Sequence, residues 1–185
     1  QATIQDMTIG LFLALILIYI VLAWVFASYT WPLAVMFTIP FGLTGAILGH
    51  LVMGLDLTIL SLFGLFGLSG IVINNSIVLL SFYRENRGHG MAPKAAIIEA
   101  ACQRLRAVIL TSSTTIAGLT PILFEQSLQA KFLIPMATSI VFGLMLGTLL
   151  ILFVVPSIVI MLENLSASVS RLFRRDKAVV EAHAV

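Results

Sequence analysis

Long runs of apolar residues alternate with short polar segments along the 185-residue chain. The five longest runs occupy residues 7–26, 33–53, 58–82, 107–124 and 132–162. A helix needs about 20 apolar residues to cross the hydrocarbon core of a bilayer, and each run reaches or approaches that length. None of the runs alternates polar and apolar positions as a barrel strand does. The pattern therefore predicts an all-α membrane helix bundle with five transmembrane helices.

A more polar segment, residues 83–106, separates the third run from the fourth. Within it, residues 92–105 place apolar side chains on one helix face, and Pro93 suits the first turn of a helix. The apolar stripe consists of Ile98, Ala101, Cys102 and Leu105. We expect a cytoplasmic loop that contains an amphipathic helix lying along the membrane surface. A solvated helical linker is the alternative.

Composition narrows the class of protein further. Charged residues make up 10% of the chain and apolar residues 60%. Soluble domains carry about 25% charged residues, so this balance excludes a soluble globular protein, a disordered chain and a nucleic-acid-binding protein. The single cysteine, Cys102, excludes an internal disulfide.

The basic residues predict the orientation of the helices, because cytoplasmic loops of membrane proteins are enriched in Lys and Arg. Residues 83–106 carry five basic side chains and residues 163–185 carry four, whereas segments 54–57 and 125–131 carry none and one. We therefore expect residues 163–185 to form a cytoplasmic tail and residues 1–6 to end a periplasmic region. Spans that begin outside the cell without a visible secretory signal suggest part of a longer protein.

Residues for enzyme chemistry are not apparent. The sequence shows no metal-ligand cluster, no glycine-rich phosphate loop after a strand and no nucleophile–base pair. His50 is interpreted as a polar tip at the membrane interface, at the end of the second run. We therefore expect neither an enzyme nor a bound cofactor or metal ion.

Polar side chains inside the apolar runs are informative, because they are costly in a membrane and need partners. Asn74 and Asn75 are adjacent near the middle of the third run. Arg104, Thr111 and Thr115 are spaced by seven and four residues, so they share one helix face. One interpretation is a polar track for water or protons between the third and fourth helices. The other is hydrogen bonding that only holds helices together, with hydroxyl groups bonded to their own backbone.

Small residues predict close packing between helices. Glycines recur at spacings of three and four residues, which keeps them near one helix face and lets backbones approach. The predicted packing positions are Gly42, Gly45 and Gly49 in the second run, Gly64, Gly67 and Gly70 in the third, and Gly143 and Gly147 in the fifth. We expect a compact bundle held together at these positions.

Four motifs follow one another beside the predicted spans. They are IPFGLTGA at residues 39–46, GIVINNSIVL at residues 70–79, QRLRAVILTS at residues 103–112 and SLQAKFLIPM at residues 127–136. In this order they resemble the C-terminal half of the membrane domain of resistance–nodulation–division (RND) efflux permeases. The resemblance covers residues 7–162, which is most of the chain.

This resemblance implies the last five of twelve membrane helices of a bacterial inner-membrane pump of the hydrophobe/amphiphile efflux type. Such pumps are homotrimers that exchange protons for drugs and work with a periplasmic adaptor and an outer-membrane channel. The resemblance also places the family's essential acidic pair in an N-terminal half that this chain does not include. The residues at the family's proton-relay positions are Asn74, Asn75, Arg104 and Thr111.

Asn74 departs from the pattern of the best-known drug pumps, which have a lysine at the matching position. A neutral amide cannot pair with a carboxylate through a positive charge of its own. Two alternatives to proton-driven drug efflux therefore stay open. One is a non-transporting membrane scaffold or degenerate half, and the other is an RND-like exporter of lipid or other cargo.

Overall fold

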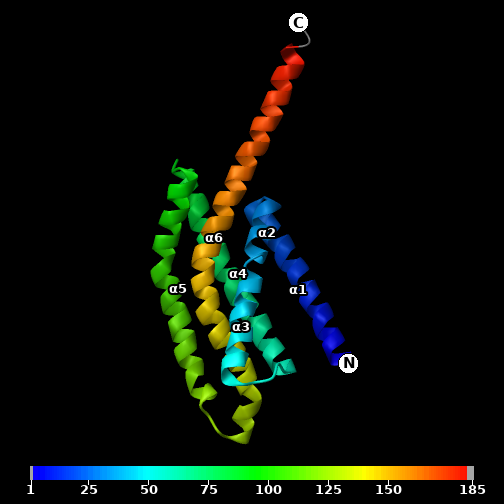
Figure 1. Ribbon diagram of the computed structural model, residues 1–185, viewed down its shortest axis with the longest axis vertical. Coiled ribbons are helices and arrows are strands. Elements are labelled where there is room, and N and C mark those ends of the chain that lie inside the picture. The colour runs from blue at the N-terminus through cyan, green and yellow to red at the C-terminus, as the bar shows by residue number, and fades with distance from the viewer. Residues whose placement is uncertain (1, 183–185) are drawn as a thin grey trace.

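The computed structural model is a bundle of α-helices (Figure 1). It describes the backbone of residues 2–182 and the side chains of residues 5–166. The helices are α1 (Ala2–Phe26), α2 (Thr30–Met36), α3 (Ile39–Met53), α4 (Ile59–Gly88), α5 (Pro93–Leu123) and α6 (Leu128–Ala182). Among the described residues, five segments are long and apolar enough to cross a membrane, and α2 and α3 together form one of them. The predicted all-α class with five membrane-spanning segments is confirmed.

The second predicted helix is broken into α2 and α3 at residues 37–38. Pro40 lies in the first turn of α3, and because it has no N–H group it cannot bond back to a carbonyl of α2. Thr38, at the break, donates its hydroxyl to the carbonyl oxygen of Val35 at 2.5 Å. The same hydroxyl lies 3.1 Å from Ser76 Oγ, so a hydrogen bond ties the break to α4.

The region around α5 differs from the prediction. The expected surface helix at 92–105 and the expected span at 107–124 form one continuous helix, Pro93–Leu123. Residues 94–117 contain no proline or glycine that would interrupt a helix. The change from polar to apolar side chains within α5 therefore marks a change of surroundings, not a change of secondary structure.

Two other helices also continue beyond their predicted ends. The helix α4 passes residue 82 and ends at Gly88, and α6 passes residue 162 and ends at Ala182. The predicted tail, residues 163–185, is therefore helical as far as the structure describes it, and residues 183–185 lie outside the described part. The loss of apolar character does not end a helix, because charged residues such as Arg, Lys and Glu are themselves good helix formers.

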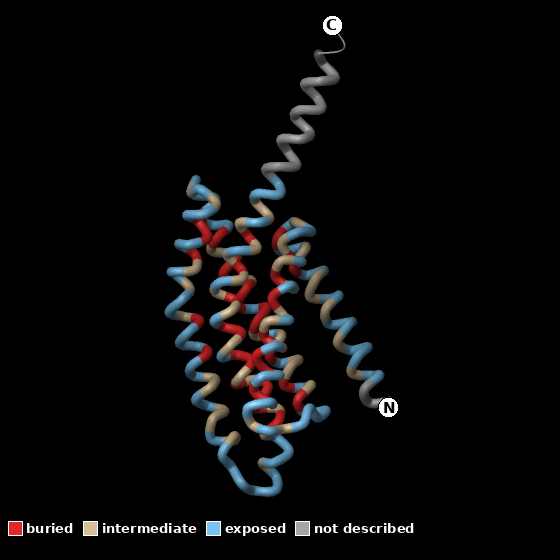
Figure 2. Tube along the Cα trace, viewed as in Figure 1, coloured by how far each residue is buried: buried red, intermediate tan, exposed pale blue. Residues whose placement is uncertain are grey.

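The helix α6 lies at the centre of the bundle, in contact with α3, α4 and α5 (Figure 1). Buried residues gather where these helices meet, and α1 leans away from them (Figure 2). Leu68 and Val72 of α4 and Leu144 of α6 belong to the same buried cluster. Among the described side chains of α1, only Leu22 and Phe26 are buried. The exposed apolar face of α1 suits contact with lipid or with further membrane helices.

Glycines occur where α3, α4 and α6 approach most closely. A Cβ atom added at Gly45 would lie 2.8 Å from the carbonyl oxygen of Phe142, and one at Gly64 would lie 2.6 Å from that of Met136. The same kind of close approach to a neighbouring helix is found at Gly42, Gly49, Gly143 and Gly147. At Gly45 and Gly64 the nearest atoms belong to the backbone of α6, so a larger residue there would require the helices to move apart.

Gly67 and Gly70 do not share these contacts, which corrects the prediction for both. A Cβ atom at either position would meet no atom within 4 Å. An α-helix turns about 100° per residue, so each step of three residues falls about 60° short of a full turn. The series that starts at Gly64 therefore rotates away from the face that meets α6.

Candidate functional site

Polar side chains from three helices meet around a small cavity inside the bundle. Asn75 of α4, Arg104 of α5 and Thr148 of α6 line this cavity, which has a volume of about 10 Å³. Its other lining residues are apolar: Leu79, Val108, Ile151 and Leu152. Asn75 is 7% exposed and Thr148 is 5% exposed, so both polar side chains lie inside the protein. We refer to this feature as the Asn75–Arg104–Thr148 cavity.

Arg104 brings a positive charge to the cavity. Its guanidinium carbon lies 5.7 Å from the centre of the Phe82 ring, within the range of a cation–π interaction. Its Nε atom is buried and has no hydrogen-bond partner in the described part of the chain. This nitrogen can only donate, because the guanidinium stays protonated. Arg104, which lines the cavity, therefore has a buried hydrogen-bond donor without a partner in the described part of the chain.

A buried pair of hydroxyl groups joins α5 to α6 beside the same cavity. Ser112 Oγ lies 2.8 Å from Thr148 Oγ1, and both residues are buried. One hydroxyl donates to the other, so the pair keeps one proton and free lone pairs for a further partner. Thr148 therefore has a fixed position and unused hydrogen-bonding capacity.

The structure brings together two of the five predicted relay residues, Asn75 and Arg104. Asn74 is exposed on α4 and lines an otherwise apolar groove of about 370 Å³ between α1 and α4. Thr111 is exposed and Thr115 is half-buried, and each donates its hydroxyl to the carbonyl oxygen four residues earlier in α5. Both threonines thus bond to their own helix, and neither lines the cavity.

A second polar cluster lies at the end of the bundle where α3 leads into α4. His50 is 3% exposed, so the prediction of a polar tip at the membrane interface is wrong. Its Nδ1 atom lies 2.9 Å from the carbonyl oxygen of Ala46, and its Nε2 atom lies 2.8 Å from Ser61 Oγ. A carbonyl oxygen only accepts, so Nδ1 carries a proton, and in the neutral ring Nε2 accepts from Ser61. Ser139 of α6 donates to the carbonyl oxygen of Ser61 at 3.1 Å and so joins a third helix to the cluster.

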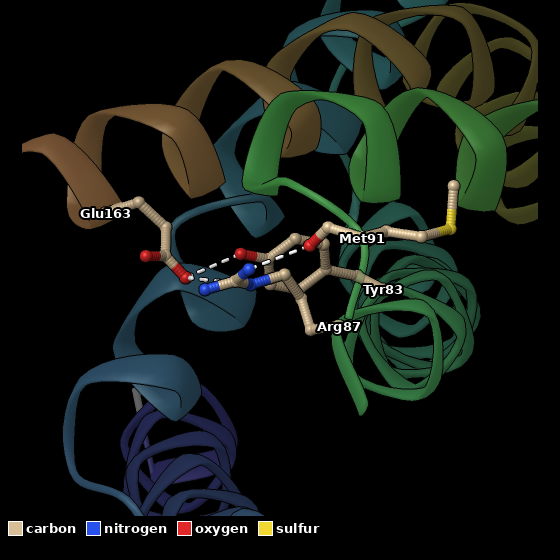
Figure 3. Close-up of polar contacts among 4 residues, drawn as sticks. All are labelled: Tyr83, Arg87, Met91 and Glu163. Carbon is tan, nitrogen blue, oxygen red and sulfur yellow. Dashed lines mark hydrogen bonds and ion pairs between the residues drawn. The ribbon is translucent and has the colours of Figure 1, made fainter. Parts of the chain in front are cut away.

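A third polar contact joins α4 to α6 at the opposite end of α4 (Figure 3). Tyr83 donates its hydroxyl to Glu163 Oε1 at 2.5 Å, and Arg87 Nε lies 3.9 Å from the same oxygen. Arg87 Nη1 also donates to the carbonyl oxygen of Met91 at 2.8 Å, in the connection between α4 and α5. One glutamate thereby links the end of α4 to α6, and one arginine extends the link toward α5.

The profile of the AcrB/AcrD/AcrF family matches residues 1–163. The chain belongs to this family. The predicted relationship to RND permeases is therefore confirmed. The chain is also similar to a heavy metal efflux pump known from an X-ray crystal structure, with 26% sequence identity and a TM-score of 0.66. This likeness covers 71% of the chain and 14% of the pump, so the chain spans only a small share of that protein's length.

In this AcrB/AcrD/AcrF-family chain, several residues of the polar clusters lie outside the sequence prediction. Thr148 is one of several hydroxyl residues in the long fifth run. Hydroxyl residues are common in membrane helices, so its presence there does not single it out. Ser112 lies among four other hydroxyl residues at positions 111–115, and the sequence does not distinguish it from them. The sequence shows that polar residues are present in the fifth run, but packing decides which helix each of them faces.

We expect Tyr83→Phe to lower the stability of this family member by about 1–3 kcal/mol, because Glu163 loses a hydrogen-bond donor while it stays partly buried. Tyr29→Phe is the matched control, since Tyr29 is 79% exposed. Thermal unfolding of the purified protein in detergent measures both effects. Equal unfolding midpoints for the two variants would mean that the contact in Figure 3 does not hold α4 to α6.

Proposed function

We propose that this chain forms part of the proton-driven engine of an RND efflux transporter, which exchanges protons for an exported compound. Membership of the AcrB/AcrD/AcrF family over residues 1–163 supports the transporter class. The observation that carries the proton role is the cationic Arg104 beside the buried polar residues Asn75 and Thr148, among otherwise apolar helices. A charged residue at the cytoplasmic mouth of a membrane bundle that faces the bundle interior is a candidate for an ion or proton pathway. The proposed activity is therefore transport, not catalysis of a covalent reaction.

Arg104 is assigned an electrostatic role in this proposal. Its guanidinium keeps its charge at physiological pH, so it does not itself carry the transported proton. A nearby positive charge favours the ionised form of a carboxyl group and lowers its pKa. The resemblance to RND permeases places the essential acidic pair in the N-terminal half of the complete protein. Movement of Arg104 relative to those acids would change their proton affinity, which is the physical basis of coupling.

Asn74, Thr111 and Thr115 are assigned to contacts with that other half. Asn74 and Thr111 are exposed and Thr115 is half-buried, so side chains of further helices can reach them. Asn74 has an amide that donates and accepts hydrogen bonds but has no charge. At this position, hydrogen bonding to a carboxylate would replace the ion pair that a lysine forms.

The proposed assembly of the complete transporter is the one that the resemblance to RND permeases implies. The complete transporter would lie in a bacterial inner membrane as a homotrimer, together with a periplasmic adaptor and an outer-membrane channel. Five basic residues at positions 83–106 support a cytoplasmic location for that segment and a periplasmic N-terminus. Amphiphilic drugs are the first candidate cargo, and heavy-metal ions are the second because a heavy metal efflux pump is similar in sequence and fold.

Reconstitution of the complete transporter in liposomes tests the proposal. An imposed proton gradient should drive movement of an amphiphilic dye or of a metal ion such as Zn²⁺, and the cargo should in turn accelerate proton movement. A protonophore should stop both movements. Transport that continues after the gradient has been removed would overturn proton coupling. Failure to move either class of cargo would favour the non-transporting scaffold.

A further inference from the structure

We infer that Arg84 is a positioning residue that fixes the C-terminal end of α1 against α4, and that it thereby sets the groove in which Asn74 lies. The contact is argued from the geometry of the described helices. Its effect on transport rests on the proposed function, whereas the contact itself does not.

Arg84 makes two separate contacts with Phe26, the last residue of α1. Its Nη1 atom donates to the carbonyl oxygen of Phe26 at 3.1 Å. Its guanidinium carbon lies 5.5 Å from the centre of the Phe26 ring, within the range of a cation–π interaction. The two contacts involve different parts of Phe26, so together they restrain both its backbone and its ring.

The end of α1 is suited to a cation, because the last carbonyl oxygens of a helix lack N–H partners and carry partial negative charge. The helix α1 has no basic residue in its own last turn. The carbonyl oxygens of Ala23 and Trp24 accept from N–H groups of the following turn. That of Phe26 accepts from Arg84, so a side chain of α4 provides the positive charge at this helix end.

The rest of α1 has little hold on the described bundle. Leu22 and Phe26 are its only buried side chains among those described, and α1 leans away from the buried core (Figure 2). Tyr19 donates its hydroxyl to the carbonyl oxygen of Tyr29 at 3.3 Å, but Tyr29 belongs to the connection between α1 and α2. Arg84 thus supplies what Tyr19 does not, a polar link from α1 to α4.

The part of α4 that carries Arg84 is itself held by other helices. Tyr83 donates its hydroxyl to Glu163 of α6. Asn86 donates its side-chain amide to the carbonyl oxygen of Ala96 in α5 at 3.1 Å. Arg84 therefore connects α1 to a segment that is fixed to both α5 and α6.

The groove between α1 and α4 depends on this connection. Its walls include Leu17 and Val21 of α1 and Ile73 and Asn74 of α4, and its volume is about 370 Å³. Asn74 lies ten residues before Arg84, which is about 15 Å along the axis of α4. No hydrogen bond or ion pair crosses the groove in the described structure, so its width depends on how the Phe26 end of α1 is held.

Distances between spin labels in the complete transporter test the position of α1. The labels are attached to Ile9→Cys in α1 and Ile59→Cys in α4, both exposed in the described chain, after other cysteines have been removed. Arg84→Met keeps an apolar stem but loses the charge and the donors, so the distance distribution should become broader and shift to longer distances. Arg84→Lys keeps a cation and N–H donors and should restore the narrow distribution. Lys94→Met is the matched control, because Lys94 is also basic but exposed in the first turn of α5.

A double-mutant cycle tests whether Arg84 acts through Phe26. Phe26→Leu removes the ring that lies beside the guanidinium. Added to Arg84→Met, it should change the distance distribution less than it does alone, because residues that share one contact have non-additive effects. Fully additive changes would overturn the assignment of Phe26 as the partner of Arg84.

Transport provides the functional readout. Arg84→Met should slow proton-driven transport about fivefold, the factor that one net hydrogen bond represents, and should shift its pH dependence because Asn74 lies in the groove. Arg84→Lys should restore both, and Lys94→Met should change neither. A role in stability alone would lower the amount of folded transporter but leave the pH dependence of the folded protein unchanged.

The inference and the proposed function fail in different ways. Unchanged label distances in Arg84→Met, in a transporter with intact proton coupling, would reject the positioning role and leave the proposed function standing. Longer distances together with an unchanged rate and pH dependence would overturn the link between α1 and transport. A displaced α1 in a transporter that shows no proton coupling would reject the proposed function and leave the Arg84–Phe26 contact standing.

Discussion

Arg104→Ala is expected to lower proton-driven transport by the complete permease about tenfold or more, which corresponds to at least about 1.4 kcal/mol. Arg104 is the one charged side chain among the residues that line the cavity. Its removal takes away the positive charge that would tune the acids of the other half. It also removes the interaction with the Phe82 ring.

Arg106→Ala is the matched control for this loss of charge. Arg106 lies two residues further along α5 and is exposed, and it does not line the cavity. Transport is measured as cargo export from cells and as gradient-driven movement in vesicles, at equal amounts of protein in the membrane. Arg104→Lys keeps the charge but loses the Nε donor, so an intermediate rate is expected. Full transport by a well-expressed Arg104→Ala permease would disprove the role of Arg104.

Gly45→Ala is expected to destabilise the bundle by about 1–3 kcal/mol, the usual effect of overpacking a well-packed interior. The added methyl group would lie 2.8 Å from the carbonyl oxygen of Phe142 and 3.0 Å from the Cα atom of Gly143. Both are backbone atoms of α6, so rotation of a side chain cannot relieve the clash. The helices α3 and α6 have to separate, although they share the most extensive contact in the described bundle.

Gly67→Ala provides the comparison, because a Cβ atom there would meet nothing within 4 Å. Alanine favours a helix over glycine by about 1 kcal/mol, so this variant should be as stable as the unchanged protein or more stable. Thermal unfolding in detergent and the yield of monodisperse protein measure both variants. A Gly45→Ala protein that unfolds at or above the midpoint of Gly67→Ala would contradict the close α3–α6 contact.

The number and class of the helices follow from local properties of the chain. A run such as residues 132–162 can satisfy its backbone polar groups in a membrane only as a helix, whatever its neighbours are. The ends of the helices are less predictable, as α5 shows. The basic residues Arg104 and Arg106 change the surroundings of that helix without ending it, because both favour helical conformation.

The candidate site was predictable only in part. Asn75 and Arg104 stand out in sequence, because an amide and a cation are unusual inside or beside an apolar run. Their separation from Asn74, Thr111 and Thr115 depends on the rotation of α4 and α5 about their axes. That rotation is set by packing against α6. As a result Asn75 is buried, whereas its neighbour Asn74 is exposed.

The amino-acid sequence alone therefore specifies a helical membrane protein and its family, since run length, low charge and linear motifs are properties of single segments. The cavity itself depends on the packed bundle. Thr148 meets Asn75 and Arg104 because glycines at α3–α6 and α4–α6 contacts allow α6 to lie at the centre of the bundle. Hydrogen bonds between helices join residues far apart in the chain, as Ser112 and Thr148 do. Such pairs have no signature in local sequence spacing, so only the packing of the helices reveals them.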